Sequence, residues 1–207
     1  MKIISKIAKW RDIWLRFSGR GIYPHELSFL LNTPLRKFIL SPTKFADSLN
    51  LNKNDFVLEI GSGPGYLSPE VAKRVESGSL FLLDIQIEML RKAKNRLKTF
   101  SNVLFVQGNA NILPFQYEKF DTAYLVTVLG EVKNIEKCLQ SIHYILRTGG
   151  KLFITEMKGD PDLIPLNQLK QIVQNCGFDL STEQKSKMGF TISFIKLDHL
   201  PKQVNNE

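Results

Sequence analysis

The segment best suited to chemistry is a glycine-rich turn that follows a short apolar run. It reads Val57-Leu-Glu-Ile-Gly-Ser-Gly-Pro-Gly65, with glycine at every second position from Gly61 to Gly65. Glycine lets a backbone turn sharply and approach a ligand closely. A strand that ends in such a turn and continues as a helix is typical of a nucleotide site at the carboxyl edge of a parallel sheet.

The glycine spacing and a nearby carboxylate separate two classes of nucleotide. A dinucleotide fingerprint has the form GxGxxG and seats a diphosphate on the helix N-terminus, but Tyr66 stands where its third glycine would be. Glu59, two residues before Gly61, would repel a diphosphate and suits a cationic amino group. The turn therefore favours an amino-acid nucleoside.

A second carboxylate, Asp84, ends the next apolar run, Ser79–Asp84. A carboxylate there accepts hydrogen bonds from both ribose hydroxyls. The alternative interpretation is a solvated aspartate at a strand end. The glycine turn ahead of it favours the ribose role.

The elements that must position these residues alternate along the chain. We expect strands over 55–60, 79–84, 102–107, 120–127 and 151–156, and helices over 67–76, 88–98, 134–147 and 165–175. Ser41-Pro42 predicts a further helix start, and 178–186 with 189–197 predict a closing hairpin. The pattern predicts a doubly wound, mostly parallel α/β sheet with an antiparallel edge, preceded by an N-terminal helical extension.

Together these residues resemble the class I S-adenosylmethionine (SAM) dependent methyltransferases, over about residues 41–197. The motifs that carry the resemblance are Glu59-x-Gly61-x-Gly63-x-Gly65, Asp84, Gly108-Asn109-Ala110, the run 120–127 and Leu146-Arg-Thr-Gly-Gly150. The resemblance implies a seven-stranded sheet in the order 3-2-1-4-5-7-6, with strand 7 antiparallel. It also implies SAM as the cofactor and S-adenosylhomocysteine as the product.

The resemblance further implies that the glycine turn packs on the methionine part of SAM, Asp84 holds the ribose, and Asn109 and Ala110 flank the adenine. The family often has Asp in place of Asn109, whose carbonyl can still accept from the adenine amino group. A proline is usual where this chain has Thr148. The predicted cofactor residues are Glu59, Gly61, Ser62, Gly63, Gly65, Asp84, Ile85, Asn109, Ala110 and Val126.

The absence of two motifs narrows the range of possible methyl acceptors. The segment Leu125-Val-Thr-Val-Leu-Gly-Glu131 contains no (Asn/Asp)-Pro-Pro-(Tyr/Phe) motif and the chain has no Pro-Cys pair, which argues against exocyclic amine, amide and cytosine C5 acceptors. A small-molecule or lipid-like acceptor is our hypothesis. The alternatives are an RNA or protein methyltransferase and a SAM-binding module without catalysis.

No catalytic base is assigned by motif, because the SAM sulfonium is already activated and the protein need only align the acceptor and at times remove a proton. Tyr23, His25 and Glu131 are candidates for contact with the acceptor. Each also has a structural interpretation, since His25 and Glu131 stand where helices are expected to begin.

The basic charge is concentrated in the N-terminal segment. The net charge is +8, and six basic residues stand against Asp12 alone in residues 1–20. Residues 2–17 predict an amphipathic helix with Trp10 and Trp14 on its apolar face. Three interpretations of this helix remain open: a lid packed on the domain, a contact with an anionic membrane surface, and a contact with nucleic-acid phosphates. We rank nucleic acid last because no nucleic-acid recognition module accompanies the helix. We divide the chain into an extension or lid, 1–40, and a SAM-binding domain, 41–207.

The remaining sequence features concern the cellular compartment and metal binding. Cys138 and Cys176 stand in no ligand spacing, which predicts a reducing compartment, no disulfide and no metal site. No apolar run reaches the length of about 18–20 residues that a membrane span needs. We expect a cytoplasmic protein, with contact to a membrane surface through residues 2–17 as the peripheral alternative.

Overall fold

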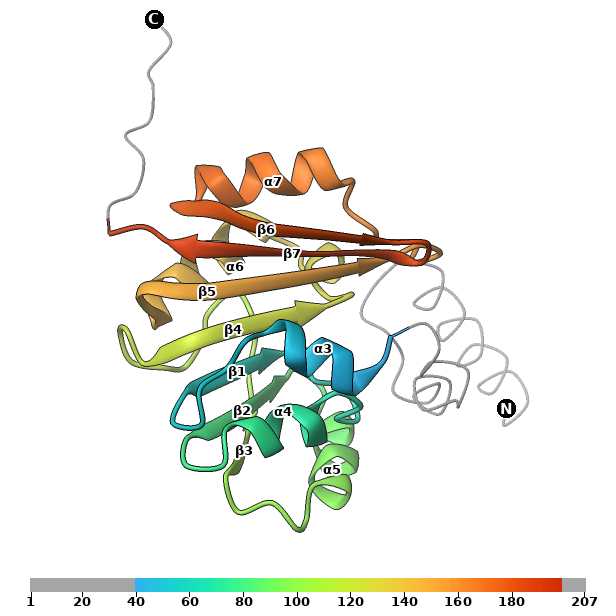
Figure 1. Cartoon of the computed structure of the whole chain (residues 1–207), viewed down its shortest axis with the longest axis vertical. Helices are drawn as coiled ribbons and strands as arrows, with labels where there is room; N and C mark the ends of the chain where they lie inside the picture. Colours follow the sequence, from blue (N-terminus) through green and yellow to red (C-terminus); the bar gives the residue numbers. More distant parts are fainter. Residues whose placement is uncertain (1–39, 199–207) are drawn as a thin grey trace, which may run out of the picture.

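The computed structural model describes residues 40–198, and their strands form one seven-stranded sheet in the order β3-β2-β1-β4-β5-β7-β6 (Figure 1). Strands β1 to β5 pair in parallel, whereas β7 runs antiparallel to both β5 and β6. The strands are β1 Phe56–Ile60, β2 Ser79–Asp84, β3 Val103–Gln107, β4 Phe120–Val126, β5 Leu146–Met157, β6 Phe178–Ser186 and β7 Gly189–Lys196. The predicted order and the antiparallel seventh strand are confirmed.

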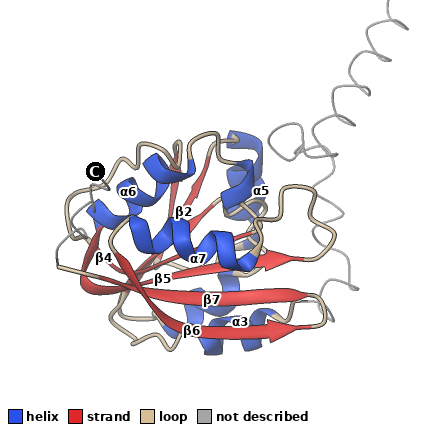
Figure 2. Ribbon diagram, turned by 90° about the horizontal axis from the view of Figure 1, so that it is seen from above, coloured by secondary structure: helices blue, strands red, loops and turns tan. Residues whose placement is uncertain are grey.

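Helices cover both faces of this sheet. They are α3 Pro42–Ser48, α4 Ser68–Arg74, α5 Ile87–Arg96, α6 Ile135–Ile145 and α7 Leu166–Asn175, with a short 3-10 helix η3 at Leu129–Glu131. One buried apolar cluster joins α3, α4 and α5 to the sheet, and a second joins α6 and α7 to it. Figure 2 shows α7 and α3 on opposite sides of strands β5, β7 and β6.

The continuous apolar runs follow from burial on both faces. In β1, Val57 belongs to the cluster with α3 and α4, and the next residue, Leu58, belongs to the cluster with α6 and α7. Side chains alternate between the faces of a strand, so a parallel strand covered on both sides must be apolar at nearly every position. Glu59 is therefore the exception in β1 that requires explanation.

Most predicted boundaries agree with the structure to within two residues. Ser41 caps α3 by accepting a hydrogen bond from the Lys44 N–H at 3.4 Å, with Pro42 in the first turn, as predicted. Cys138 and Cys176 are buried free thiols.

Strand β5 departs from the prediction. We expected the strand to begin at Lys151, after Gly149 and Gly150, but β5 begins at Leu146, which pairs with Phe120. The register shifts between Phe120 and Thr122, and Gly149 has φ +75°. Residues 148–150 form an irregular start to β5, because β4 pairs with β5 on both sides of them.

Several predictions fall outside the described residues. The helix expected over 2–17, the extension 1–40 up to its last residue, and Tyr23 and His25 belong to the part of the chain that is not described. Within residues 40–198, no helix is both long and apolar enough to cross a membrane.

Candidate functional site

The glycine turn after β1 adopts a backbone that favours glycine at three positions. Gly61, Gly63 and Gly65 have φ values of +69°, +52° and +71°, in the left-handed region. The N–H groups of Gly61 and Ser62 both donate to the Leu83 carbonyl, at 2.8 and 3.1 Å. The three glycines are thus a conformational requirement of a turn that folds back onto the end of β2.

The segment after β4 packs against this turn. A Cβ atom on Gly61 would lie only 2.5 Å from Val128 Cγ2. Thr127 has φ +52°, which is strained for a β-branched residue, and its N–H donates to the Thr155 carbonyl at 2.9 Å. Strain of this kind gathers at functional sites. The ends of β1, β4 and β5 therefore form one connected edge where the strand order reverses, the usual ligand position in this architecture.

Asp84 joins the glycine turn to the end of β2. It is 7% exposed, and its Oδ2 accepts from the Gly63 N–H while its Oδ1 accepts from the Gln86 N–H, both at 2.8 Å. Burial raises the pKa of Asp84, against the effect of these N–H groups. A carboxylate has about four lone-pair positions. Asp84 can therefore hold the turn and still accept from a ligand hydroxyl.

Glu59 lies behind the turn rather than along its rim. It is 4% exposed, and its Oε2 accepts from the Ser68 hydroxyl at the start of α4, at 2.5 Å. Burial and the Glu59 carboxylate raise the pKa of Tyr124 well above its usual value. Ser68 was missed by the sequence analysis. The signal that could have found it is a hydroxyl at the first residue of the helix after a glycine turn, close to an acid.

The residues expected at the adenine come together at the neighbouring strand ends. Asp84 pairs with Gln107, so Ile85 and Asn109 follow adjacent strands on one edge. Ile85 is 42% exposed, Asn109 is exposed and Ala110 is partly buried. The Oδ1 of Asn109 already accepts the Asn111 N–H at 2.9 Å, which leaves one lone pair for the adenine amino group.

Two other predicted residues lie nearer the glycine turn. Ser62 is 6% exposed, and its hydroxyl has no hydrogen-bond partner among residues 40–198. A buried hydroxyl without a partner is costly, so a polar group of a ligand fits here. Val126 is the last residue of β4 and is partly buried.

Acidic residues gather where β4 and β5 end. Glu156 in β5 is 1% exposed, and burial together with Asp160, Asp162 and Glu131 raises its pKa to about 8. Glu131 was predicted as an acceptor-side candidate and ends η3. Glu156 was missed, although it is the only carboxylate within the expected strand 151–156. No group of three His, Cys, Asp or Glu side chains within residues 40–198 could hold a metal ion.

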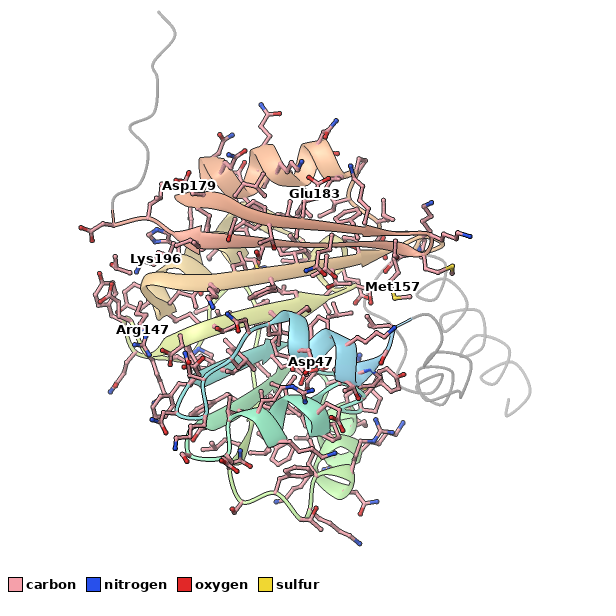
Figure 3. All side chains as sticks on the ribbon, in the orientation of Figure 1. Asp47, Arg147, Met157, Asp179, Glu183 and Lys196 are labelled. Atoms are coloured by element: carbon pink, nitrogen blue, oxygen red, sulfur yellow. The ribbon has the colours of Figure 1, made fainter. Side chains whose placement is uncertain are left out.

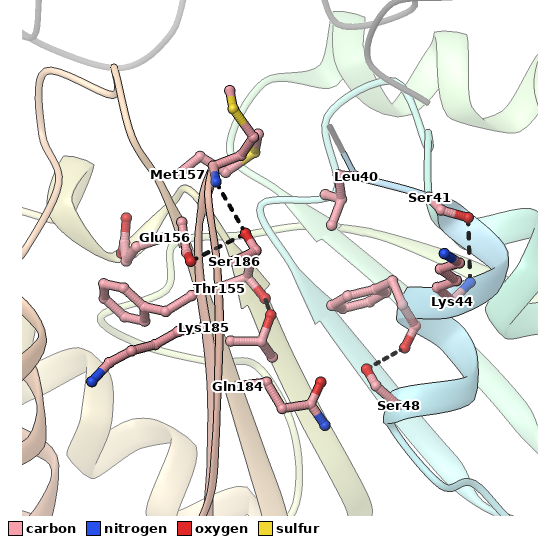
Figure 4. A pocket seen from close by; sticks show the side chains of 15 residues that line it. Leu40, Ser41, Lys44, Ser48, Thr155, Glu156, Met157, Gln184, Lys185 and Ser186 are labelled. Atoms are coloured by element: carbon pink, nitrogen blue, oxygen red, sulfur yellow. Dashed lines mark hydrogen bonds between the residues drawn. The ribbon is translucent and has the colours of Figure 1, made fainter. Parts of the chain in front are cut away.

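A groove of about 550 Å³ opens between α3 and the turn of the β6–β7 hairpin (Figure 4). Its apolar lining consists of Leu40, Phe45, Met157, Met188 and Phe190, and its polar lining includes Ser41, Ser48, Thr155, Thr191 and Gln184. The Tyr66 hydroxyl donates to the Leu40 carbonyl at 3.2 Å. The α3 side of the groove is thus bonded to the residue that follows the glycine turn.

Comparisons with known proteins agree with this architecture. Residues 51–205 match a family model described as a methyltransferase domain. A methyltransferase from Aquifex aeolicus described as SAM dependent has a TM-score of 0.80 at 20% identity, covering 84% of this chain and all of that one. A related structure from Methanococcus maripaludis has a TM-score of 0.69 at 21% identity, covering 84% and 91%.

Curated relatives are closer in sequence. The ubiquinone/menaquinone biosynthesis C-methyltransferase UbiE of Cronobacter sakazakii is 33% identical over 126 residues, which is 59% of this chain and 50% of that protein. UbiE of Haemophilus ducreyi is 30% identical over 147 residues, 69% of this chain and 54% of that protein. The chain spans about half the length of the curated relatives it matches.

The fold and the family match define the class: the chain belongs to the methyltransferase domain family. Its strand order and its likeness to solved SAM-dependent methyltransferases show that it has the class I fold of that family.

Proposed function

We propose that this enzyme transfers the methyl group of SAM to a ring carbon of a small, quinone-related acceptor. The observation that carries the proposal is the similarity to C-methyltransferases of ubiquinone and menaquinone biosynthesis. The groove lined by Leu40, Phe45 and Met188 supports it, because ligand sites for such molecules are mostly apolar with a few polar groups.

The cofactor roles inferred for the site form part of the proposal. Asp84 would accept from the ribose hydroxyls, and the turn from Gly61 to Gly65 would pack on the methionine part, with the buried Ser62 hydroxyl available to a polar group of the ligand. Ile85, Asn109 and Ala110 would border the adenine, and Val126 the reacting centre. Glu59 would act through Ser68 and electrostatic attraction to the amino group.

Carbon methylation places a definite demand on the protein. SAM supplies an activated methyl group, so the protein must hold an electron-rich carbon in line with it and exclude water. A ring hydroxyl raises electron density at the adjacent carbon most strongly when it loses its proton. Proton removal by a positioned side chain is therefore the expected contribution of this site beyond alignment.

The first experiment is a calorimetric titration with SAM and S-adenosylhomocysteine, with NAD as the control. We expect micromolar binding of both adenosyl compounds and none of NAD. Isotope-labelled SAM is then offered with hydroquinones that carry or lack an apolar side chain, and the methylated atom is located by NMR. Methylation at oxygen, or turnover only with unrelated acceptors, would overturn the acceptor assignment while leaving SAM binding intact.

The N-terminal extension enters the proposal through its sequence. Trp10, Trp14 and the basic residues of segment 2–17 suit an anionic membrane surface, where a lipid-like acceptor would be met. We expect sedimentation with anionic vesicles and little with neutral ones. A protein lacking residues 2–17 that sediments equally with anionic vesicles would favour the lid interpretation.

A further inference from the structure

Glu156 has features that cofactor binding does not explain. It is the second-last residue of β5 and only 1% exposed, yet its Oε1 has no hydrogen-bond partner among the residues described. It is one of the residues that line the groove between α3 and the β6–β7 hairpin, where Figure 4 labels it beside Thr155. A buried carboxyl oxygen without a partner is costly, so a role outside packing is indicated.

The groups that act on this carboxyl are all acidic. Asp160 and Asp162 act on it from the segment after β5, and Glu131 acts from η3, while its register partner on β7 is the apolar Phe190. The two segments are packed tightly against each other, since a Cβ atom on Gly130 would lie 1.9 Å from the Asp162 carbonyl oxygen. Burial, and to a smaller extent these acids, raise the pKa of Glu156 to about 8. Proton exchange near neutral pH is therefore within its reach.

The carboxyl also lies close to the edge where the methyl donor is expected. Thr155, the residue before Glu156, accepts a hydrogen bond from Thr127 at the end of β4, and Val128 packs on Gly61 at the end of β1. Neighbouring strands are about 4.8 Å apart. Two such steps place Glu156 about 10 Å from the glycine turn along the sheet.

We propose that Glu156 is the proton-accepting residue of this methyl transfer, and that its ionisation is coupled to the positive charge of the methyl donor. The inference rests on the proposed function, because it requires SAM at the glycine turn. Glu156 loses its proton to solvent when a sulfonium cation is present nearby, since a positive charge stabilises the carboxylate.

The transfer then restores that proton. The S–CH3 bond breaks with its electron pair left on sulfur, a C–CH3 bond forms on the acceptor ring, and Glu156 takes the proton of the acceptor hydroxyl. The methylated carbon still carries its hydrogen at this stage, and loss of that hydrogen as a proton to solvent, with return of a proton from solvent to the ring oxygen, restores the aromatic hydroxyl. The sulfonium and the carboxylate thereby become a neutral thioether and a neutral carboxylic acid. No uncompensated charge remains in a poorly hydrated site, where such a charge is costly.

The test compares proton release on binding SAM and S-adenosylhomocysteine, by calorimetry in buffers of different ionisation enthalpy. The two compounds share their amino and carboxylate groups, so the difference reports the sulfonium charge. At about 10 Å and an effective dielectric constant of about 20, the charge lowers the pKa of Glu156 by about one unit. Near pH 7.5, SAM should release about half a proton more than S-adenosylhomocysteine.

Two variants and one wild-type measurement complete the test. Glu156→Gln should abolish the difference in proton release, and Glu76→Gln, at an exposed position, should keep it. In the wild type, the preference for SAM over S-adenosylhomocysteine should rise about tenfold between about pH 6 and pH 9. Equal proton release by both compounds and a flat preference would overturn the role of Glu156. Failure of both compounds to bind would instead count against the proposed function.

Discussion

The two ends of the sheet differ in how they accommodate buried ionisable groups. Figure 3 shows Lys196 and Arg147 at the end opposite Met157. At the end where the parallel strands begin, Lys196 is 3% exposed and donates to the Leu146 carbonyl at 2.7 Å and to Glu118 at 3.2 Å. Asp121 pairs there with Arg147 and accepts the Phe56 N–H at 2.7 Å. Opposite charges meet, and the strand ends are joined.

At the end where the parallel strands finish, carboxyl groups are buried instead. Asp84 is bonded to the backbone N–H groups of Gly63 and Gln86, and Glu156 is flanked by further acids. Three glycines and Thr127 adopt left-handed backbone conformations along the same edge. The comparison teaches that one end of the sheet pairs its buried charge with groups of opposite sign, whereas the other keeps acidic groups for the cationic ligand proposed above.

The largest expected effect comes from a pair of matched glycine substitutions. A Cβ atom would meet a backbone carbonyl oxygen at 1.9 Å on Gly130 and at 2.1 Å on Gly78, which stand at opposite ends of the sheet. Both Gly→Ala variants should lose about 1–3 kcal/mol of unfolding free energy in denaturant titrations. Only Gly130→Ala should also lose about a hundredfold in turnover, because misplaced reacting groups are that costly. Equal losses of turnover in the two variants would contradict the distinction between the two ends of the sheet.

A smaller effect is expected from a pair of aspartates. Asp84→Ala should weaken SAM binding at least tenfold in calorimetry, because the bond to Gly63 and the proposed ribose contacts are lost together. Asp55→Ala removes a similar bond, to the Asn52 N–H at 2.9 Å, at the other end of the sheet. It should leave SAM affinity unchanged, and unaltered affinity in Asp84→Ala would remove Asp84 from the site.

Lys196→Met tests the end of the sheet where the parallel strands begin. The Leu146 carbonyl loses its buried donor, so the free energy of unfolding should fall by about 1–3 kcal/mol while SAM affinity stays the same. Lys98→Met, at an exposed position, is the control and should change neither. A drop in SAM affinity without a loss of stability would show that the two ends are not separate in function.

The smallest effect is the pH dependence of stability, which should have opposite sign at the two ends. The hydrogen bond from Lys196 is the largest factor that lowers the pKa of Glu118 below 4.5, so this contribution to stability is present above about pH 4.5 and is lost as the pH falls. The pKa of Glu156 is raised to about 8, so its contribution is present below pH 4.5 and is lost as the pH rises through 8.

Thermal denaturation tests the predicted direction of the change in stability with pH. Between about pH 7 and pH 9 the wild-type Tm should fall by a few degrees, roughly 2–4 °C for each kcal/mol, and the Glu156→Gln variant should show a smaller fall. A variant that loses as much stability as the wild type over this range would contradict the raised pKa of Glu156.

Local signals predicted much of the fold and the glycine turn. The apolar runs, the cap at Ser41 and the glycine turn depend on nearest neighbours, because burial, capping and positive φ restrict which residues fit. The irregular start of β5 was not predicted, because it depends on pairing with Phe120, far away in the chain.

The sequence by itself determined the class of this protein: alternating strands and helices, three glycines at the required positions and an acid at the end of the second strand. Only the tertiary structure decided what surrounds each acid. It bonded Glu59 to Ser68, turned Asp84 toward Gly63 and buried Glu156 beside Asp160 and Asp162. The physical reason is that a carboxyl group's charge state and bonds depend on neighbours brought together by folding, not on its place in the chain.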